Sequence, residues 1–412
     1  MEVVHERAAG MDISKTDAKV CVRVPSTRKG VFTKSVTTYG ATTNEVLRLR
    51  GDLENAGVSV VVMEATGDYW KPFFFVLAET LKVELVNATQ ARNIPGRKTD
   101  VSDATWLAEL AAHGLLRASF VPPEPVRELR DLTRTRTGLS QERTREYSRM
   151  EKELEAAGIK LSSVASTLTT LSSRRILDAL VAGERDPHVL AGLAHTSMIK
   201  KSAQLVEALT GRFTAHHAFM TKLHLDRIDQ IDRSVAAIDA RIEDTIAPFQ
   251  LARELIAEIP GISARTAMTI LAEIGTDMSV FPTAGHLASW AGVCPGQNES
   301  AGRAKSSATR QGNRHLKGAL GIAALSISRS NTTYLAVKYR RLRSHTGPLK
   351  AVVALEHTLL VIIWNMLNNG VAYEELGPDY YAKKNPDRAR ADALRKLNTL
   401  GFDVQLTPRA AA

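Results

Sequence analysis

The spacing of hydrophobic positions predicts strands in the first 120 residues. Val20, Val22 and Val24 alternate with polar or small residues, as the residues of a half-buried strand do. The segment from Val58 to Met63 is a continuous run dominated by valine, which is typical of a central strand covered on both faces. The segment from Lys82 to Val86 is a shorter strand candidate.

A helix is expected after these strands. Residues Ser102 to His113 have helical spacing, with Ser102 suited to the N-cap and Gly114 just past the end. Strands that alternate with helices indicate an α/β domain over residues 1–125. Its boundary is marked by three prolines, Pro122, Pro123 and Pro125.

The pattern then changes to long helices over residues 126–250. Seven apolar residues recur there at spacings of three to five: Leu223, Ile228, Ile231, Val235, Ile238, Ile242 and Ile246. Such a stripe favours the seam of a coiled coil or of a helical hairpin. The pattern leaves open whether the seam closes within one protomer or between two.

Residues 251–377 are expected to be mainly helical with one interrupting loop, followed by a charged tail over residues 378–412. The longest apolar stretch, Ala351 to Leu367, contains Glu356 and His357. We interpret it as a buried helix, because a membrane span needs roughly 20 consecutive apolar residues. No membrane partner is expected.

Composition adds a preference for polyanions. The 412 residues carry a net charge of +10, which favours a nucleic-acid partner, although a basic enzyme of another kind would share this charge. The two cysteines, Cys21 and Cys294, lie far apart and have no metal-ligand spacing, which fits a reducing cytosol. The N-terminal segment is acidic and lacks an apolar core, so we expect no signal peptide.

Four acidic residues stand where nuclease chemistry needs them. Asp12 opens one strand candidate, Glu64 closes another, and Asp100 and Asp103 begin the helix. Carboxylates gathered from separate elements repel one another, and a pair of divalent cations offsets that cost. Alternatively, Asp100 and Asp103 only stabilise a helix N-terminus. The flanking residues Lys15, Arg97 and Lys98 are candidate phosphate contacts, whereas Asp17 and Asp68 are left outside the site.

A second constellation is the polar, basic segment from Pro295 to Arg314, which we expect to be a loop. Ser300 is a candidate nucleophile there, since a serine hydroxyl needs proton removal or an electrophile activated by cations. Positive charge would come from Arg303, Lys305, Arg310 and Arg314. The alternative is a phosphate-binding loop in which Ser300 only donates a hydrogen bond.

A tight turn precedes this loop. Pro260 and Gly261 lie between two helix-like segments, as in a helix-hairpin-helix motif that aims backbone N–H groups at a phosphate. A plain Pro-Gly turn between helices remains the alternative.

Taken together, these motifs resemble the insertion-sequence-110 family of transposases, the DEDD-type recombinases of bacterial mobile elements. The resemblance covers nearly the whole chain and rests on the order of its motifs, which are Met11–Lys15, Met63–Gly67, Arg97–Ala104, Ile259–Ile262, Trp290–Pro295, Asn298–Gly302 and Gly312–Lys317. It implies a RuvC-like domain of the RNase H fold, a helical coiled-coil middle and a mainly helical C-terminal transposase domain.

The resemblance also implies roles for residues. Asp12, Glu64, Asp100 and Asp103 would bind Mg²⁺, two ions per site, and Ser300 would be the nucleophile. Some family members have Ser-Ser-Gly where this chain has Glu299, Ser300 and Ala301, so Ser306 and Ser307 remain alternatives. Further implied are donor and target double-stranded DNA, a structured bridge RNA that guides the protein by base pairing, and dimers assembled into a tetramer.

The expected function is therefore that of a bacterial, cytoplasmic and nucleoid-associated transposase that cuts and rejoins DNA through a phosphoserine intermediate. Two alternatives stay open at this point: a metal-dependent hydrolytic nuclease resembling a Holliday-junction resolvase, and a non-catalytic nucleic-acid-binding scaffold.

Overall fold

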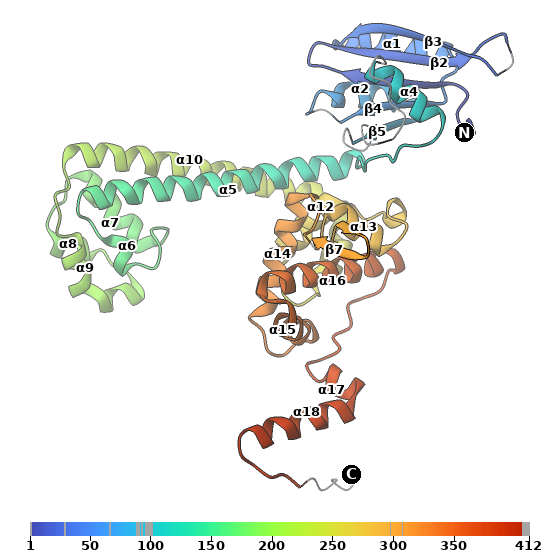
Figure 1. The fold of residues 1–412 in the computed structure, drawn as a ribbon. Coiled ribbons are helices and arrows are strands. Elements are labelled where there is room, and N and C mark those ends of the chain that lie inside the picture. The colour runs from blue at the N-terminus through green and yellow to red at the C-terminus, as the bar shows by residue number, and fades with distance from the viewer. Residues whose placement is uncertain are drawn as a thin grey trace. The chain divides into compact units, whose positions relative to one another are not determined.

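A computed structural model describes residues 2–28, 30–65, 67–87, 91, 94, 102–296, 298–306 and 308–405. The chain divides into two compact units, Met1–Val121 and Pro122–Ala412 (Figure 1).

The first unit is a mixed five-stranded sheet with helices. Its elements are β1 (Ala8–Ile13), β2 (Asp17–Pro25), β3 (Phe32–Gly40), α1 (Thr43–Asn55), β4 (Val60–Glu64), α2 (Trp70–Leu77), β5 (Val83–Val86) and α4 (Asp103–Ala112). The strand order is β3-β2-β1-β4-β5, in which β1, β2 and β3 are antiparallel while β4 and β5 run parallel to β1. The strands predicted around Val20–Val24, Val58–Met63 and Lys82–Val86 and the α/β organisation are confirmed, and β4 lies inside the sheet as its valine run indicated. The expectation that Asp12 opens a strand is wrong, because β1 begins at Ala8 and Asp12 lies near its end.

The two faces of the sheet carry separate cores. Ala9, Met11 and Met63 belong to a core that includes apolar residues of α1 and α2. Ala8, Val60 and Val62 belong to the other core, with Leu107 and Leu110 of α4. Because side chains alternate along a strand, every second residue of β1 and β4 faces α4.

The predicted cap of α4 is confirmed. Ser102 is its N-cap, and the Ser102 side chain accepts a hydrogen bond from the Thr105 N–H. Gly114 follows the helix with a φ of +62°, a conformation that glycine adopts at little cost.

The second unit is mostly helical. It begins with α5 (Glu124–Ala156), and its next elements are α6 (Leu161–Val164), α7 (Leu171–Ala182), α8 (Pro187–Gly192), α9 (Ser202–Leu209) and α10 (Ala215–Ile246). It continues with α11 (Gln250–Ala257), α12 (Ala264–Ile274), α13 (Ala284–Ala291), β6 (Asn298–Ser300), β7 (Arg303–Ser306), α14 (Arg314–Ser328), α15 (Tyr334–Thr346), α16 (Pro348–Asn369), α17 (Tyr380–Lys384) and α18 (Pro386–Thr399).

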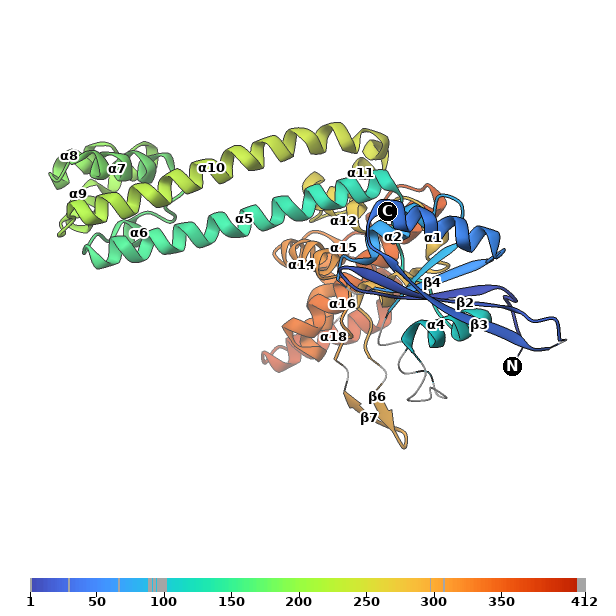
Figure 2. The ribbon, with the colours of Figure 1, turned by 90° about the horizontal axis from the view of Figure 1, so that it is seen from above.

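Helices α5 and α10 pack along one another as a hairpin within one chain (Figures 1 and 2). The apolar stripe on α10 is uneven, because Ile228, Ile242 and Ile246 are buried while Leu223 is exposed. The expectation of one continuous apolar seam is therefore wrong at Leu223.

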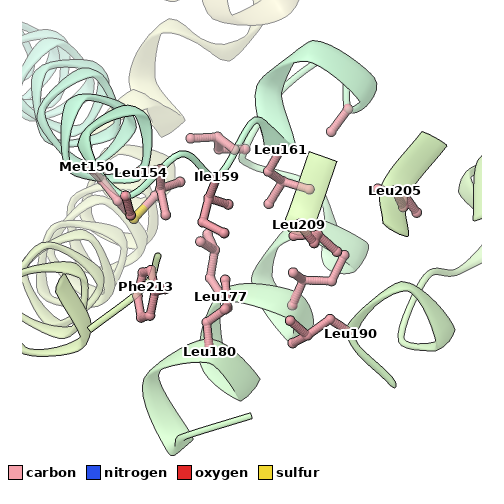
Figure 3. Close-up of a cluster of buried hydrophobic side chains, with 14 of the residues drawn as sticks. Met150, Leu154, Ile159, Leu161, Leu177, Leu180, Leu190, Leu205, Leu209 and Phe213 are labelled. Carbon is pink, nitrogen blue, oxygen red and sulfur yellow. The ribbon is translucent and has the colours of Figure 1, made fainter. Parts of the chain in front are cut away.

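Residues between α5 and α10 form a small helical subdomain of their own. Its core joins Met150 and Leu154 of α5 to residues of α7, α8 and α9 (Figure 3). Figure 3 shows Ile159, Leu177 and Leu209 gathered between these helices.

Helix α16 is long and apolar enough to cross a membrane by length and composition. One of its faces is nonetheless buried in the second unit, including Leu355, Leu359 and Ile363, and it packs against α13, α14 and α15. The Trp364 indole N–H donates to the Phe281 carbonyl at 2.9 Å. These contacts are those of a core helix of a folded unit.

Candidate functional site

Two of the four predicted acids, Asp12 and Glu64, lie at the same end of adjacent strands, and a third, Asp103, begins the helix that covers this face of the sheet. In the parallel pair of β1 and β4, Met11 lies opposite Met63, so that Asp12 and Glu64 are the next residues at the same end of adjacent strands. Both belong to the set of alternate residues that faces α4. Asp103 is the first residue of α4, and Asp100 lies outside the described residues.

Glycine at position 10 brings α4 close to this site. A Cβ on Gly10 would meet the Ala104 carbonyl oxygen and the Ala108 amide nitrogen at 2.3 Å each. Only a residue without a side chain allows that approach. Cys21 pairs with Gly10 across the sheet and is buried beside Ala104 and Ala108, and burial raises the pKa of its thiol. The start of α4 is thereby held against β1, two residues before Asp12.

The three described acids of the predicted set lie at or near the surface. Asp12 is exposed, while Glu64 and Asp103 are half-buried. Solvent reaches these residues because they lie at or next to the ends of their elements, where the sheet meets solvent.

The residue types suit a hard cation. Asp12, Glu64 and Asp103 offer only carboxylate oxygens, and Mg²⁺ typically takes one or two carboxylates and keeps several waters. Among the described residues, however, no three His, Cys, Asp or Glu side chains lie close enough to hold one ion. The donor chemistry therefore fits Mg²⁺, and Asp100 is the remaining member of the proposed set.

The acids left out of the site have other partners. Asp17 accepts a hydrogen bond from the Ser14 hydroxyl at 2.7 Å in the turn between β1 and β2. Asp68 pairs with Lys71 at 3.0 Å. Lys15 lies exposed in that same turn, three residues from Asp12, while Arg97 and Lys98 lie outside the described residues.

An acid that sequence reasoning missed is Glu109 on α4. It contacts Lys34 at 2.8 Å and the buried Arg23 at 3.4 Å. Burial would raise the pKa of Glu109, but the hydrogen bond and charge of Lys34 and the charge of Arg23 outweigh it and hold the pKa below its usual value. Glu109 thus ties α4 to β2 and β3, and no local sequence pattern marks it.

The segment with Ser300 is a β-hairpin, so the expectation of a loop is wrong. β6 and β7 pair with Ser300 opposite Arg303, and Figure 2 shows this hairpin standing away from the helices of the second unit. The tip consists of Ala301 (φ +51°) and Gly302 (φ +74°). Positive φ at both positions is the requirement of a type I′ turn, which suits glycine and strains alanine.

The base of the hairpin is fixed by close backbone packing. A Cβ on Gly312 would meet the Ala291 carbonyl oxygen at 2.3 Å, and one on Gly292 would meet Gly312 at 2.8 Å. The Gly296 N–H donates to the Ala308 carbonyl at 2.9 Å. Arg303, Arg310 and Arg314 are exposed around this hairpin, whereas the side chain of Lys305 in β7 lies outside the described set.

A buried ion cluster lies beneath this base. The Glu273 side chain is fully buried and accepts hydrogen bonds from Arg134 at 2.8 Å to each oxygen and from Asn313 at 2.6 Å. Arg130 donates to the Ala272 and Glu273 carbonyls at 3.0 and 2.6 Å. Asn313 in turn caps α14, accepting from two backbone N–H groups.

The arginines of α5 form ion pairs with other helices of the second unit. Burial opposes ionisation of Glu273, but the hydrogen bonds from Arg134 and Asn313 and both arginine charges outweigh it and hold its pKa below the usual value. Elsewhere on α5, Arg136 pairs with Asp239 and Arg143 with Asp232, both on α10. Arg130, Arg134, Arg136 and Arg143 therefore stabilise the second unit through ion pairs between its helices.

The Pro260–Gly261 turn lies between α11 and α12 as expected. Gly261 has a φ of +87°, and a Cβ there would meet Ile327 at 2.5 Å. The Ser263 side chain caps α12 by accepting from the Thr266 N–H. A groove lined by Ser263, Arg265 and Arg253 lies at this N-terminus, next to Asp239 and Glu243 of α10.

Two family models match successive parts of this chain. Residues 9–158 match the DEDD transposase model of the IS110 family, and residues 253–340 match the transposase model of the IS116/IS110/IS902 family. One relative is an uncharacterized 43.6 kDa protein of insertion element IS110 from Streptomyces coelicolor, to which the chain is 32% identical over 146 residues. These residues are 34% of this chain and 35% of that protein.

A second relative is matched over more of its length. It is an uncharacterized 42 kDa protein of insertion element IS900 from Mycobacterium paratuberculosis, 31% identical over 301 residues, which are 67% of this chain and 73% of that protein. With both family models matched in order along one chain, this protein belongs to the IS110 family of insertion-sequence transposases.

Proposed function

We propose that this transposase cuts and rejoins DNA through Ser300, with Mg²⁺ held by Asp12, Glu64, Asp100 and Asp103. The observation that carries the proposal is that Asp12 and Glu64 end adjacent parallel strands on the sheet face covered by α4, whose first residue is Asp103. Acids from three elements would repel one another there without cations. The strand order β3-β2-β1-β4-β5 is that of the RNase H fold and supports the RuvC-like assignment of the first unit.

Residues of both units would take part in binding and activating the phosphate. Mg²⁺, when bound, would polarise the phosphate and stabilise the leaving oxygen. Lys15 would neutralise phosphate near the acids, while Arg303, Arg310 and Arg314 would do so around the hairpin. The positive φ of Ala301 supports a catalytic role for Ser300, which lies next to the hairpin tip, because residues with strained backbone conformations are common at functional sites.

The reaction would balance as a transesterification. The Ser300 Oγ loses its proton and bonds to phosphorus, the P–O bond to a deoxyribose oxygen breaks, and that oxygen takes up a proton. A hydroxyl of a second strand then attacks the phosphoserine, which restores Ser300 and joins the new strands. The number of phosphodiester bonds is conserved, so no ATP is needed.

The test is denaturing electrophoresis of the full chain with element-end DNA, the candidate guide RNA and Mg²⁺. Ser300→Ala and Asp12→Ala should abolish a covalent protein–DNA adduct. The matched controls Ser306→Ala in the same hairpin and Asp17→Ala in the adjacent turn should keep it. Cleavage without an adduct that persists in Ser300→Ala would replace this proposal with the hydrolytic nuclease. Absence of any cleavage would favour the scaffold.

We further propose that a bridge RNA guides the enzyme and that dimers assemble into a tetramer. The net charge of +10 supports a polyanionic partner. Exposed Phe219 and Leu223 on α10 support a contact with a second copy along the α5–α10 hairpin. Light scattering of the protein with and without the RNA tests the assembly, and a monomer under both conditions would exclude it.

A further inference from the structure

A groove lies between α15 and the tail helices α17 and α18, and we call it the tail groove. Its charged lining comprises Arg341 of α15, Lys384 of α17, and Arg388, Asp392 and Lys396 of α18, with His345 alongside. Four permanent cations against one carboxylate leave this lining with a net charge of +3, counting histidine as neutral.

The tail that forms one wall is anchored to the body of the second unit. Glu375 accepts a hydrogen bond from the Tyr334 N–H at 2.7 Å, at the first residue of α15. The Tyr373 hydroxyl donates to the same carboxylate at 3.1 Å. This carboxylate therefore binds both the tail and the start of α15.

Aromatic contacts extend the anchor into the groove. The ring of Tyr334 lies 4.9 Å from that of Tyr380 and is stacked on Tyr381 at 5.7 Å. The guanidinium of Arg341 lies over Tyr381 at 4.7 Å, and the ammonium of Lys384 lies over Tyr380 at 5.6 Å. Two of the lining cations are thereby positioned by tyrosine rings.

Apolar packing does not account for α18, since none of its residues is buried. Arg388 and Lys396 of α18 line the same groove as Arg341 of α15. Asp392 pairs with Arg388 at 4.0 Å and with Arg395 at 3.4 Å, so it offsets only part of this charge. Like charges gathered along one groove repel one another, and a bound anion relieves that repulsion. Arg388 and Lys396 are two helical turns apart, about 12 Å along the axis. Cations spread over that length suit a repeating anion better than one compact ligand.

We propose that the tail groove binds the phosphodiester backbone of a single-stranded nucleic acid. Such sites combine a cationic groove with aromatic side chains and show little sequence preference. The inference rests in part on the proposed function, because it adds a nucleic-acid site to a protein proposed to act on DNA under RNA guidance. A single-stranded segment of RNA or of DNA would present the same backbone chemistry.

The test measures binding of labelled single-stranded RNA and DNA by the full chain between roughly 50 and 200 mM salt. Lys384→Glu/Arg388→Glu reverses two groove cations, and Lys383→Glu/Arg390→Glu makes the same charge change at neighbouring residues outside the groove. Glutamate at position 388 falls in the first turn of α18, where acids are favourable, so the helix should persist.

The groove variant should lower the slope of log affinity against log salt by about 1.4, since each single-strand phosphate contact contributes about 0.7. The control should keep the wild-type slope. A lower slope for RNA alone would identify the bound strand as RNA. An equally lower slope for RNA and DNA would show that the groove binds either backbone. Equal losses in variant and control, or no loss in either, would overturn the inference.

The adduct assay separates the two proposals. If the wild-type chain forms the Ser300 adduct and the groove variant binds nucleic acid normally, the tail-groove proposal is wrong and the proposed function stands. If the wild-type chain forms no adduct and the groove variant still loses binding, the proposed function is wrong and the tail-groove proposal stands.

Discussion

Replacing Glu273 by glutamine should destabilise the second unit more than any exposed charge change. The Glu273 carboxylate is fully buried and accepts three hydrogen bonds, two of them from Arg134. Glutamine keeps one acceptor oxygen but places an NH₂ group, itself a donor, next to the donors of Arg134 or Asn313. At least one charge-assisted hydrogen bond is therefore lost. The loss of one such bond costs about 1.5–3 kcal/mol.

The remaining cost comes from the orphaned cations. Removing one partner of a buried pair costs about 3–5 kcal/mol in all. The side chain of Arg130 is 14% exposed and would stay largely buried without its counter-ion, whereas Arg134 is 37% exposed and can rehydrate. This partial rehydration places the expected loss in the free energy of unfolding near the lower limit, about 3 kcal/mol.

The assay is urea unfolding followed by hydrogen exchange in peptides from α5, α12 and α14. Glu243→Gln is the matched control, because Glu243 lies in the same unit and pairs with Arg253 at 3.1 Å while 66% exposed. An exposed pair contributes about 0–1 kcal/mol. Equal losses in the two variants, or a loss in Glu273→Gln below about 1 kcal/mol, would refute the reasoning.

Three further predictions concern pH, close packing and strain. Because the folded-state pKa of Glu273 is lowered, its carboxylate stabilises the second unit fully above the unfolded pKa of about 4.3. This stabilisation is lost as the pH falls through the folded-state pKa. The free energy of unfolding of the second unit should therefore depend less on acidic pH in Glu273→Gln, and an unchanged pH dependence would contradict this. Gly10→Ala should destabilise the first unit by about 3 kcal/mol in thermal unfolding, because its Cβ overlaps the backbone of α4. Gly51→Ala in α1, where a Cβ meets nothing within 4 Å, should instead stabilise that unit by about 0.4–1 kcal/mol, and equal effects of the two would show that close packing is not the cause. Ala301→Gly should relieve about 1 kcal/mol of strain at the hairpin tip and increase protection of the β6–β7 amides, whereas lower protection would argue against the turn.

Much of the fold could be predicted because its signals are local. The valine run of β4, the alternation in β2 and the cap at Ser102 each depend on residues a few positions apart. The family motifs likewise identified the chain as a transposase before any contact was known. The hairpin of Ser300 was missed because its tip holds alanine at a position where the turn chemistry indicates glycine or asparagine.

The sequence by itself determined three strands and one helix of the first unit, the acidic residue types and the family. Only the tertiary structure decided which residues meet, because strand register and helix packing join positions far apart in the chain. The pairing of Met11 with Met63 sets Asp12 beside Glu64, and the missing side chain of Gly10 lets α4 bring Asp103 to the same face. The same long-range packing buried Glu273 between Arg130 and Arg134, a role that depends on partners more than 130 residues away.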